Sequence, residues 1–387
     1  VLFRSAIPQP EVDDVPDNGQ HVFASGYQHL FRFLESVGTR QHVCFPGTMT
    51  FRMPGGATHL NSVKGLAALG PATGDLPGVT GLDRVRTAVA QARLIRQSLK
   101  QPADLDRITA KEWFDRLGMP ESARKAQWDG IVIGLTGDKP TISSAKVPAD
   151  LLATGVRRAM ATRTPISIGY PTVDLDTLFI RSTERVFRER GVTVRTRAWV
   201  RCVDVQDGQV RGVTLVDGEQ LTADIVICAV PVWKVRGVLD QVPEHAVIYR
   251  ACDHLTPVPI VSVNLYLDRS IETADWGEIL YGGEGVLEQL WDRQRMHGRD
   301  PAKTWFYSTT VSAAYDLVKQ SNAEILAAQM AMLRRYYPAA KDAQVVHSHI
   351  VRMPASTFAQ RPGTFGVRPD QRTSVRGLAI AGDWTRT

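Results

Sequence analysis

Apolar residues recur at helical spacing in several stretches of the chain, and each stretch predicts an amphipathic helix. In residues 82–100 the apolar positions lie broadly on one side of the predicted helix: Leu82, Val85, Val89, Ala92 and Leu99. Thr109, with Glu112 three residues later, forms a capping-box pattern that predicts a helix over residues 109–117. Three further helices are predicted over residues 25–37, 175–191 and 322–337.

Short apolar runs bounded by turn residues predict β-strands between these helices. The dipeptides Asp207-Gly208 and Asp217-Gly218 predict two successive hairpins. The run that follows, residues 225–230, is closed by Pro231 and predicts a buried strand. Further strands are predicted within residues 41–60, 257–268, 304–311 and 345–353.

The C-terminal run, residues 378–381, is apolar and passes directly into Gly382 and Asp383. A buried strand that breaks at a glycine and meets a carboxylate suits a nucleotide or flavin site at the carboxyl end of a sheet. Glycine permits close approach of a ligand, and the carboxylate accepts hydrogen bonds from ribose or ribityl hydroxyls. An ordinary core strand that ends in a turn explains the same residues, so both interpretations stay open.

Length and composition place these elements in a large globular protein. A chain of 387 residues indicates two or three domains, with room to bury a cofactor or an elongated substrate. The four cysteines are far apart in the sequence, which argues against a zinc site or a disulfide framework and indicates a reducing cytosol: Cys44, Cys202, Cys228 and Cys252. No stretch approaches the roughly 18–20 apolar residues of a transmembrane helix, so any membrane contact is expected to be peripheral.

The net charge of +6 reflects an excess of basic residues, and these gather in only one predicted helix, residues 82–100. Lysines and arginines are dispersed, without the aromatic interleaving of a nucleic-acid platform, so no nucleic-acid partner is expected. Residues 82–100 contain one acidic residue, Asp83, and five basic residues: Arg84, Arg86, Arg93, Arg96 and Lys100. Such a helix either lies on an anionic bilayer or has an ordinary solvated face. We predict a cytoplasmic protein and leave contact with the inner face of the cell membrane as an alternative.

Several common catalytic patterns do not match this chain. It has no GxSxG nucleophile elbow, and residues 134–141 have the wrong spacing for a phosphate-binding loop and are predicted to form an ordinary loop. His347 and His349 share one face of a predicted strand without a third ligand, so we expect structural roles and no metal. A GxGxxG dinucleotide fingerprint is also absent.

Three motifs in order resemble the superfamily of FAD-dependent amine oxidases and carotenoid desaturases. They are DNGQH at 17–21, ADIVICAVP at 223–231 and GLAIAGDWT at 377–385. Within the superfamily the chain is most similar to the hydroxysqualene dehydroxylases, through DNGQHVFASGY at 17–27, SSA at 143–145, YPTVDLDTLF at 170–179 and PASTFAQRPG at 354–363. The resemblance spans nearly the whole chain.

The resemblance implies an α/β (α+β) two-domain flavoprotein of the amine oxidase type, in which a substrate domain is inserted into a Rossmann-like FAD-binding domain. Its expected FAD-binding segments are residues 1–40, 176–245 and 366–387, and its expected substrate-domain segments are residues 41–175 and 246–365. The first βαβ unit and the helix after GDWT are expected in the family and have no counterpart here. We therefore predict a fragment truncated at both ends that, in this form, does not hold FAD tightly.

The resemblance also assigns site residues. Gly382 and Asp383, followed by Trp384 and Thr385, are expected against the ribityl and pyrophosphate region of FAD, and the backbone of Val200 against adenine. The residues expected on the other side of the dinucleotide are Ala229, Val230 and Pro231. Those expected near the isoalloxazine are Asn18, Gly19, Gln20 and His21. His21 is the candidate general acid because histidine titrates near neutral pH.

By this resemblance the expected reaction is reductive removal of the hydroxyl of hydroxysqualene to give squalene, a step of squalene and hopanoid biosynthesis. An alternative is oxidative desaturation of phytoene or another carotenoid precursor, or another reaction of the flavin amine oxidase type. A second alternative is a non-catalytic fragment that binds a lipid or a partner. The dehydroxylation and the carotenoid desaturation both imply an apolar isoprenoid as the ligand, and the sequence does not predict the oligomeric state.

Overall fold

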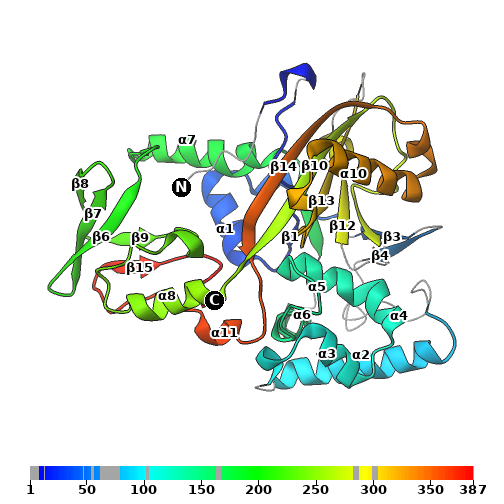
Figure 1. Ribbon diagram of the computed structural model, residues 1–387, viewed down its shortest axis with the longest axis horizontal. Helices are drawn as coiled ribbons and strands as arrows, with labels where there is room; N and C mark the ends of the chain where they lie inside the picture. The colour runs from blue at the N-terminus through cyan, green and yellow to red at the C-terminus, as the bar shows by residue number, and fades with distance from the viewer. Residues whose placement is uncertain are drawn as a thin grey trace.

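A seven-stranded sheet at the centre of the molecule draws its strands from distant parts of the chain (Figure 1). The computed structural model describes residues 8–12, 14–46, 48–53, 56–61, 79–101, 104–162, 167–281, 287–298 and 304–386. All neighbouring strands of this sheet are antiparallel except β11 and β3. Its strands, in spatial order, are β14 (Val345–Phe358), β10 (Pro257–Leu267), β13 (Trp305–Val311), β12 (Leu287–Asp292), β11 (Gly277–Tyr281), β3 (Thr48–Met53) and β4 (Gly56–Asn61).

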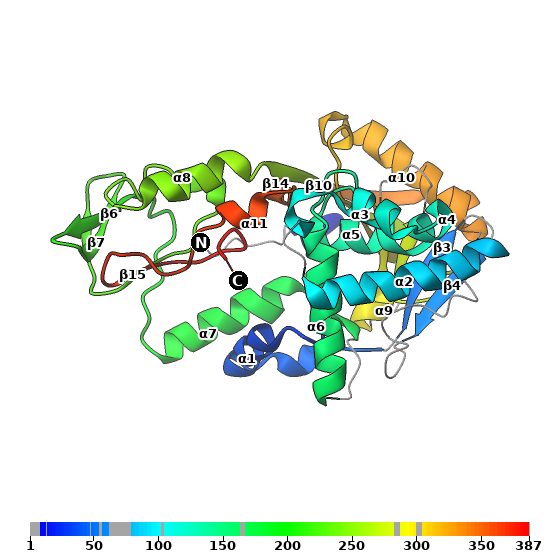
Figure 2. The ribbon, with the colours of Figure 1, turned by 90° about the horizontal axis from the view of Figure 1, so that it is seen from below.

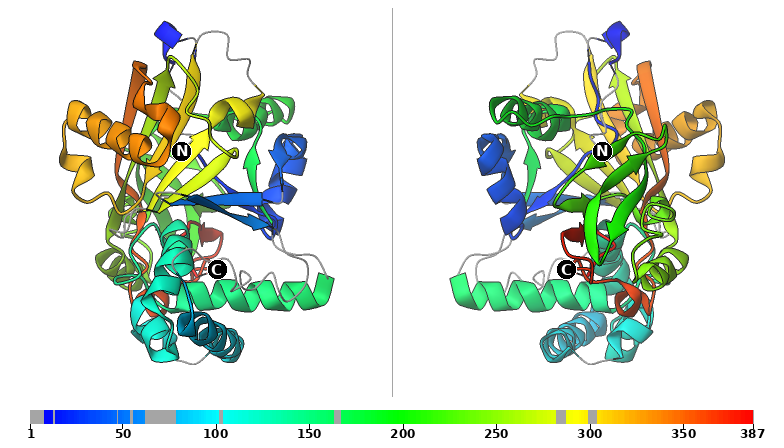
Figure 3. Two further views of the ribbon diagram at one scale, coloured as in Figure 1. Left: turned by 90° about the vertical axis from the view of Figure 1, so that its right-hand side faces the viewer. Right: turned by 90° about the vertical axis from the view of Figure 1, so that its left-hand side faces the viewer.

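The two faces of this sheet differ in chemistry. The apolar face of β10 packs against helix α10 (Asn322–Tyr336) through Val261, Val263, Leu265 and Leu267. On the opposite face, side chains of β10 are polar or aromatic: Ser262, Asn264 and Tyr266. Figure 3 shows α10, in orange, on one side of the sheet and the blue N-terminal helix α1 (Gln28–Val37) on the other. The predicted strands 257–268 and 304–311 and the predicted helix 322–337 are confirmed, whereas β14 continues five residues beyond the predicted 345–353.

Below this sheet in Figure 1 lies a helical region with its own aromatic core. Within that core Trp113 stacks on Phe114, and the ring of Trp128 packs on Phe114 at a tilt. The predicted capping box is present, since the side chain of Thr109 accepts from the backbone of Glu112 and the Glu112 side chain accepts in return. The helices of this region are α2 (Leu82–Lys100), α3 (Ala110–Leu117), α4 (Glu121–Ala123), α5 (Asp129–Thr136) and α6 (Lys146–Thr162). Residues 134–136 end α5, so the predicted loop 134–141 begins only at Gly137.

At the far side of the sheet, two hairpins and a parallel strand pair form a third region (Figure 1). The hairpins at Asp207-Gly208 and Asp217-Gly218 are confirmed and join β6 (Val200–Gln206), β7 (Gln209–Leu215) and β8 (Gln220–Thr222). The parallel pair consists of β9 (Val226–Cys228) and β15 (Leu378–Ile380). The strand predicted at 225–230 is present as β9, but the prediction that it is buried is wrong, because Ile225 and Ile227 are 70% and 66% exposed. Only one face of β9 packs on the core beneath it.

Smaller elements complete the fold. A three-stranded sheet combines β1 (Phe23–Ala24), β5 (Ile168–Pro171) and β2 (Val43–Cys44). Residues 23–24 are thus a strand, and α1 begins three residues later than the predicted helix 25–37. The predicted helix 175–191 begins as a π-helix, Asp176–Arg181, and continues as α7 (Ser182–Glu189). The remaining helices named here are α8 (His245–His254), α9 (Arg293–His297) and α11 (Thr364–Val367).

The predicted domain segments stay a prediction, but the sheets join them in pairs. The seven-stranded sheet takes strands from segments 41–175 and 246–365, and the β9–β15 pair takes one strand from 176–245 and one from 366–387. In the part of the chain that the structure describes, no helix is both long and apolar enough to cross a membrane.

A buried ion pair ties the N-terminal segment to the seven-stranded sheet. Arg293, at the start of α9, and Asp14 are 1% and 0% exposed at their side chains, and Nη1 lies 2.5 Å from Oδ2. The Tyr266 hydroxyl donates to the same carboxylate oxygen at 2.8 Å. Because both charges are removed from water, loss of either partner leaves an uncompensated buried charge.

We expect Asp14→Ala to lower the free energy of unfolding by about 3–5 kcal/mol, because the Arg293 guanidinium then stays buried without its carboxylate. The matched control is Asp253→Ala, which removes the carboxylate of the exposed pair with Arg236 and is expected to cost about 1 kcal/mol or less. Urea unfolding of both variants measures the difference. Equal losses would contradict the role assigned to the buried pair.

Candidate functional site

The carboxyl ends of β9 and β15 meet at one edge, where the predicted C-terminal motif lies. The two strands are parallel, and the pairing continues beyond them because the Ala381 N–H donates to the Cys228 carbonyl at 2.9 Å. The indole N–H of Trp384 then donates to the Val230 carbonyl at 3.1 Å. Residues 229–231 and 382–385 therefore lie side by side, which is the usual position of a ligand site in a parallel sheet.

The turn after β15 requires glycine at position 382. Gly382 has a φ of 150°, and a Cβ there would lie 2.6 Å from the indole nitrogen of Trp384. Trp384 and Thr385 are both fully buried, and the Thr385 hydroxyl donates to the Gly382 carbonyl at 2.8 Å. These two predicted site residues thus support the turn from within, whereas Gly382 and Asp383 are exposed.

Asp383 is held by groups that sequence reasoning missed. The Thr357 hydroxyl of β14 donates to its carboxylate at 3.4 Å. Arg368 donates to the backbone carbonyls of Asp383 and Thr385 at 2.7 and 2.6 Å. An arginine that binds carbonyls in this way leaves no local sequence signal, because its partners lie 15 and 17 residues away. The backbone at Asp383 is thereby held in place, and its exposed carboxylate keeps acceptor capacity for a ligand.

The other residues predicted to line the dinucleotide are more scattered. Ala229 and Pro231 are exposed, and Val230 is half-buried beside Trp384. Val200 lies in a different sheet, as the first residue of β6, where it pairs with Leu215 and is 36% exposed. Its expected contact with adenine stays a prediction.

The predicted isoalloxazine segment, residues 17–21, lies on the polar face of the seven-stranded sheet. Asp17 is fully buried; its carboxylate accepts the Leu175 N–H at 3.0 Å, and its carbonyl accepts the side-chain amide of Asn264 at 3.4 Å. A Cβ on Gly19 would lie 3.0 Å from Ser262 Oγ and 3.7 Å from Met353 Cε. The segment therefore passes close over β10 and β14.

Strand β14 connects the two halves of the candidate site. Gly19 lies near Met353, and Asp383 is bonded to Thr357, four residues further along the strand. At about 3.3 Å per residue, these contacts are about 13 Å apart. Two segments that are more than 360 positions apart in the sequence thus face one extended stretch, which suits an elongated ligand.

Buried polar atoms beside residues 17–21 lack partners within the described protein. Gln20 and Asn264 each use their amide N–H group, but their carbonyl oxygens are unpaired, as is the hydroxyl of Ser262. Each unsatisfied buried group costs about 1–3 kcal/mol. This face is therefore chemically suited to a polar ligand edge or to ordered water.

His21 and Asn18 lie at the accessible end of this segment. Asn18 is half-buried, and the His21 side chain is exposed, yet protein atoms crowd the His21 ring closely enough that desolvation lowers its pKa. The imidazole is accordingly neutral at pH 7 and better suited to accept a proton than to donate one. The next residue, Val22, packs against the stacked rings of Trp276 and Trp291.

The remaining motifs contact one another at two places. The Ser144 N–H donates to the Gln360 carbonyl at 2.7 Å, which joins the SSA motif to PASTFAQRPG, while Leu175 joins YPTVDLDTLF to Asp17. His347 contacts Gln9 at 2.9 Å, and burial lowers the pKa of His349, in keeping with the structural roles predicted for both. Among the described residues no cluster of three or more potential metal ligands is found.

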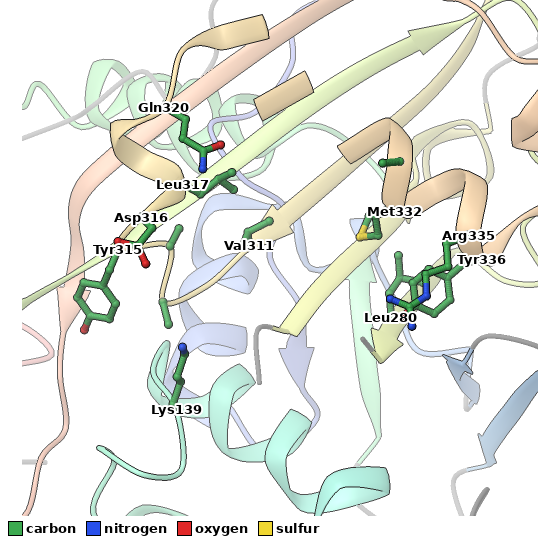
Figure 4. Close-up of a pocket in the computed structure, with 13 residues that line it drawn as sticks. Lys139, Leu280, Val311, Tyr315, Asp316, Leu317, Gln320, Met332, Arg335 and Tyr336 are labelled. Carbon is green, nitrogen blue, oxygen red and sulfur yellow. The ribbon is translucent and has the colours of Figure 1, made fainter. Parts of the chain in front are cut away.

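A cavity of about 550 Å³ lies apart from these motifs, on the α10 side of the sheet (Figure 4). Leu280 and Val311 line it, and both belong to the core that packs under α10. Lys139 and Arg335 contribute charged groups at its margin. Because the sheet separates it from residues 17–21, the cavity is not part of the candidate site.

The sequence matches a known family and several named relatives over nearly its whole length. A family model described as flavin-containing amine oxidoreductase matches residues 8–387. The probable zeta-carotene desaturase of Synechococcus elongatus is 22% identical over 95% of this chain and 83% of its own. The 15-cis-phytoene desaturase of Solanum lycopersicum is 20% identical over 96% of this chain and 65% of its own.

Two solved structures share the fold. A putative protoporphyrinogen oxidase from Exiguobacterium sp. has a TM-score of 0.68 at 16% identity and covers 98% of this chain and 85% of its own. A putrescine oxidase has a TM-score of 0.67 at 16% identity and covers 97% of this chain and 84% of its own. The predicted fold class, a flavoprotein of the amine oxidase type, is confirmed.

We expect Asp17→Asn to change how stability depends on pH. Burial raises the pKa of Asp17 from 3.8 to about 7, although Arg293 opposes the shift. Between these values the folded protein holds a proton that the unfolded chain has released, so the free energy of unfolding falls as pH rises from about 4 to about 7. Asparagine stays neutral, and Gln20 can rotate its amide to accept from it.

The variant should therefore gain stability relative to the wild type as pH rises through this window. At about 1.4 kcal/mol per pKa unit, the full gain is on the order of 4 kcal/mol. Urea unfolding of both proteins across the range measures it. Parallel pH profiles would show that Asp17 is already ionised in the folded protein at low pH.

Proposed function

This chain belongs to the family of flavin-containing amine oxidoreductases, and we propose that it dehydrogenates an apolar isoprenoid. It is an enzyme, an FAD-dependent oxidoreductase. The observation that carries the proposed substrate class is the likeness, over nearly the whole chain, to proteins named zeta-carotene desaturase and 15-cis-phytoene desaturase. The sequence motifs favoured dehydroxylation and left desaturation as the alternative. These relatives favour desaturation.

Reductive dehydroxylation of hydroxysqualene is kept as a second candidate because residues 17–27, 143–145, 170–179 and 354–363 resemble the dehydroxylases. The motifs that resemble the dehydroxylases are in contact with one another: Ser144 with Gln360, and Leu175 with Asp17. Both reactions act on a long apolar isoprenoid and differ in the direction of hydride transfer.

The residues at the edge of β9 and β15 fit FAD. Gly382 offers backbone without a side chain, Asp383 offers an exposed carboxylate for hydroxyl groups, and Ala229 adds a small exposed neighbour. The unpaired carbonyl oxygen of Gln20 and the hydroxyl of Ser262 offer polar contacts at the other end. When bound, FAD accepts a hydride equivalent in a dehydrogenation or, once reduced, delivers one.

The protein's own contribution is to orient the substrate and to take up a proton. Dehydrogenation removes a hydride and a proton from neighbouring carbons, and His21, which is neutral at pH 7, is our candidate to receive the proton. The aromatic stack of Tyr170 and Trp276, with ring centroids 4.4 Å apart, packs beside Val22. Trp276 is 3% exposed, so this stack supports the segment that carries His21 from within the protein.

Product identification tests the proposal. The purified protein is incubated with FAD and phytoene or zeta-carotene, and separately with FAD, a reductant and hydroxysqualene. We expect additional conjugated double bonds in the carotenoid, visible as a red shift in absorbance. Squalene as the main product would establish the second candidate instead. A colourless protein that takes up no FAD would favour the non-catalytic, lipid-binding alternative.

We expect Asp383→Ala to weaken FAD binding about tenfold to a hundredfold, because the loss of a hydrogen bond to a charged group costs about 1.5–3 kcal/mol. The control is Asp370→Ala, which removes a carboxylate that is exposed and paired with Arg386. Titration of flavin fluorescence measures both affinities. Equal affinities for the two variants would remove Asp383 from the proposed cofactor site.

A further inference from the structure

Helix α2 exposes its apolar side and buries polar residues. Leu82, Val85 and Val89 are 62%, 61% and 45% exposed, and Leu99 is 36% exposed. The residues that α2 buries are mostly small or polar: Thr87, Ala90, Gln91, Leu94 and Ser98. A surface helix normally turns its apolar stripe toward the core, so α2 has the opposite arrangement.

Specific hydrogen bonds hold α2 in this orientation. The buried Gln91 amide donates to the Gln127 side chain at 3.1 Å. The indole N–H of Trp113 donates to the Gln97 side chain at 2.7 Å, and Arg93 donates to the Leu117 carbonyl at 3.2 Å. Rolling the helix to bury the apolar stripe would break these bonds. The exposure of the stripe is therefore a fixed feature of the fold.

Basic side chains surround the apolar stripe. With 3.6 residues per turn, Arg96 lies within the stripe of Leu82, Val85 and Val89, and Arg86 and Lys100 lie along its margin. Arg86 is 3.5 Å from Asp83, and both side chains are exposed. Arg96 and Lys100 form no ion pair with any residue that the structure describes. This face thus combines apolar side chains with free positive charge.

The helix lies where a flat surface can reach it. Figure 1 shows α2 along the lower edge of the molecule, and Figure 2, seen from below, shows its length running across that side. The helix has 19 residues, which corresponds to about 28 Å at 1.5 Å per residue. A planar partner that approaches this edge can therefore lie along the helix, whose apolar residues Leu82, Val85 and Val89 are exposed.

We propose that α2 docks this protein on an anionic lipid bilayer. Leu82, Val85 and Val89 enter the boundary between headgroups and acyl chains, while Arg96 and Lys100 contact lipid phosphates. A second copy of the chain fits less well, because antiparallel pairing about the middle of the helix, Gln91, places Arg96 against Arg86. Docking brings the protein to the phase that dissolves an apolar isoprenoid, a consequence that rests on the proposed function.

Vesicle co-sedimentation of the FAD-loaded protein, without isoprenoid, tests the docking surface. Vesicles of phosphatidylcholine alone are compared with equimolar phosphatidylcholine and phosphatidylglycerol, at low and high salt. We expect binding to the anionic vesicles that weakens as salt is raised. Since no substrate is present, the result does not depend on whether the proposed reaction is correct.

Two double variants test the two components of the face. Each basic residue near an anionic surface contributes about 1 kcal/mol, or about a fivefold change in affinity, so Arg96→Glu with Lys100→Glu should weaken binding about 25-fold or more. Val85→Ser with Val89→Ser, which leaves the net charge unchanged, should weaken it about tenfold or more through lost apolar burial. The matched control is Arg188→Glu with Arg190→Glu, the same charge change at exposed positions at the end of α7, with binding expected within about twofold of the wild type.

Thermal unfolding and flavin content confirm that each variant is folded, and if one α2 variant fails this check the other still provides the test. Unchanged vesicle binding in a folded α2 variant would overturn the proposal. An equal loss of binding in the α7 control would also overturn it, because the attraction would then come from net charge alone. A dimer that disappears in the α2 variants, without vesicle binding by the wild type, would overturn it in favour of self-association.

Discussion

Asp14 and Arg293 are 279 positions apart in the sequence and meet inside the protein, with the hydroxyl of Tyr266 on the same carboxylate. Their ion pair places the N-terminal segment against the polar face of the seven-stranded sheet. Asp17, three residues further on, is buried as a consequence, and its pKa reflects both that burial and the opposing charge of Arg293. The position of residues 18–21, and therefore of the candidate flavin-proximal groups, depends on this contact.

The candidate cofactor site is assembled from segments that only the folded chain brings together. Strand β14 contacts Gly19 through Met353 and Asp383 through Thr357, so a single strand sets the spacing between the two ends of the site. The parallel pairing of β9 with β15 then fixes the turn at Gly382, and buried Trp384 prevents any side chain at that position. Rigid backbone pairing thus positions groups that a dinucleotide can use.

The proposed substrate class and the surface of α2 are linked by solubility. An isoprenoid without charged groups partitions into lipid, so an enzyme that uses it benefits from contact with a bilayer. Helix α2 combines exposed Val85 and Val89 with Arg96 and Lys100, which have no ion-pair partner in the described part of the chain, and its buried polar side hydrogen-bonds to neighbouring helices. The helical region therefore combines a stable internal core with an outward apolar surface.

Local patterns in the sequence determined the elements that depend on short-range interactions. The capping box of Thr109 and Glu112, the Asp-Gly hairpins and the bounds of α2 follow from hydrogen bonds and backbone preferences within a few residues. The motifs also identified the family, because the chain contains the residue types that the family has, in the same order. Tertiary structure alone decided which side of α2 is buried, that Ile227 is exposed, that Trp384 is internal and that Arg368 holds Asp383. The burial and hydrogen bonds of these residues depend on residues far away in the sequence. The identity of a residue does not specify which part of the protein it packs against.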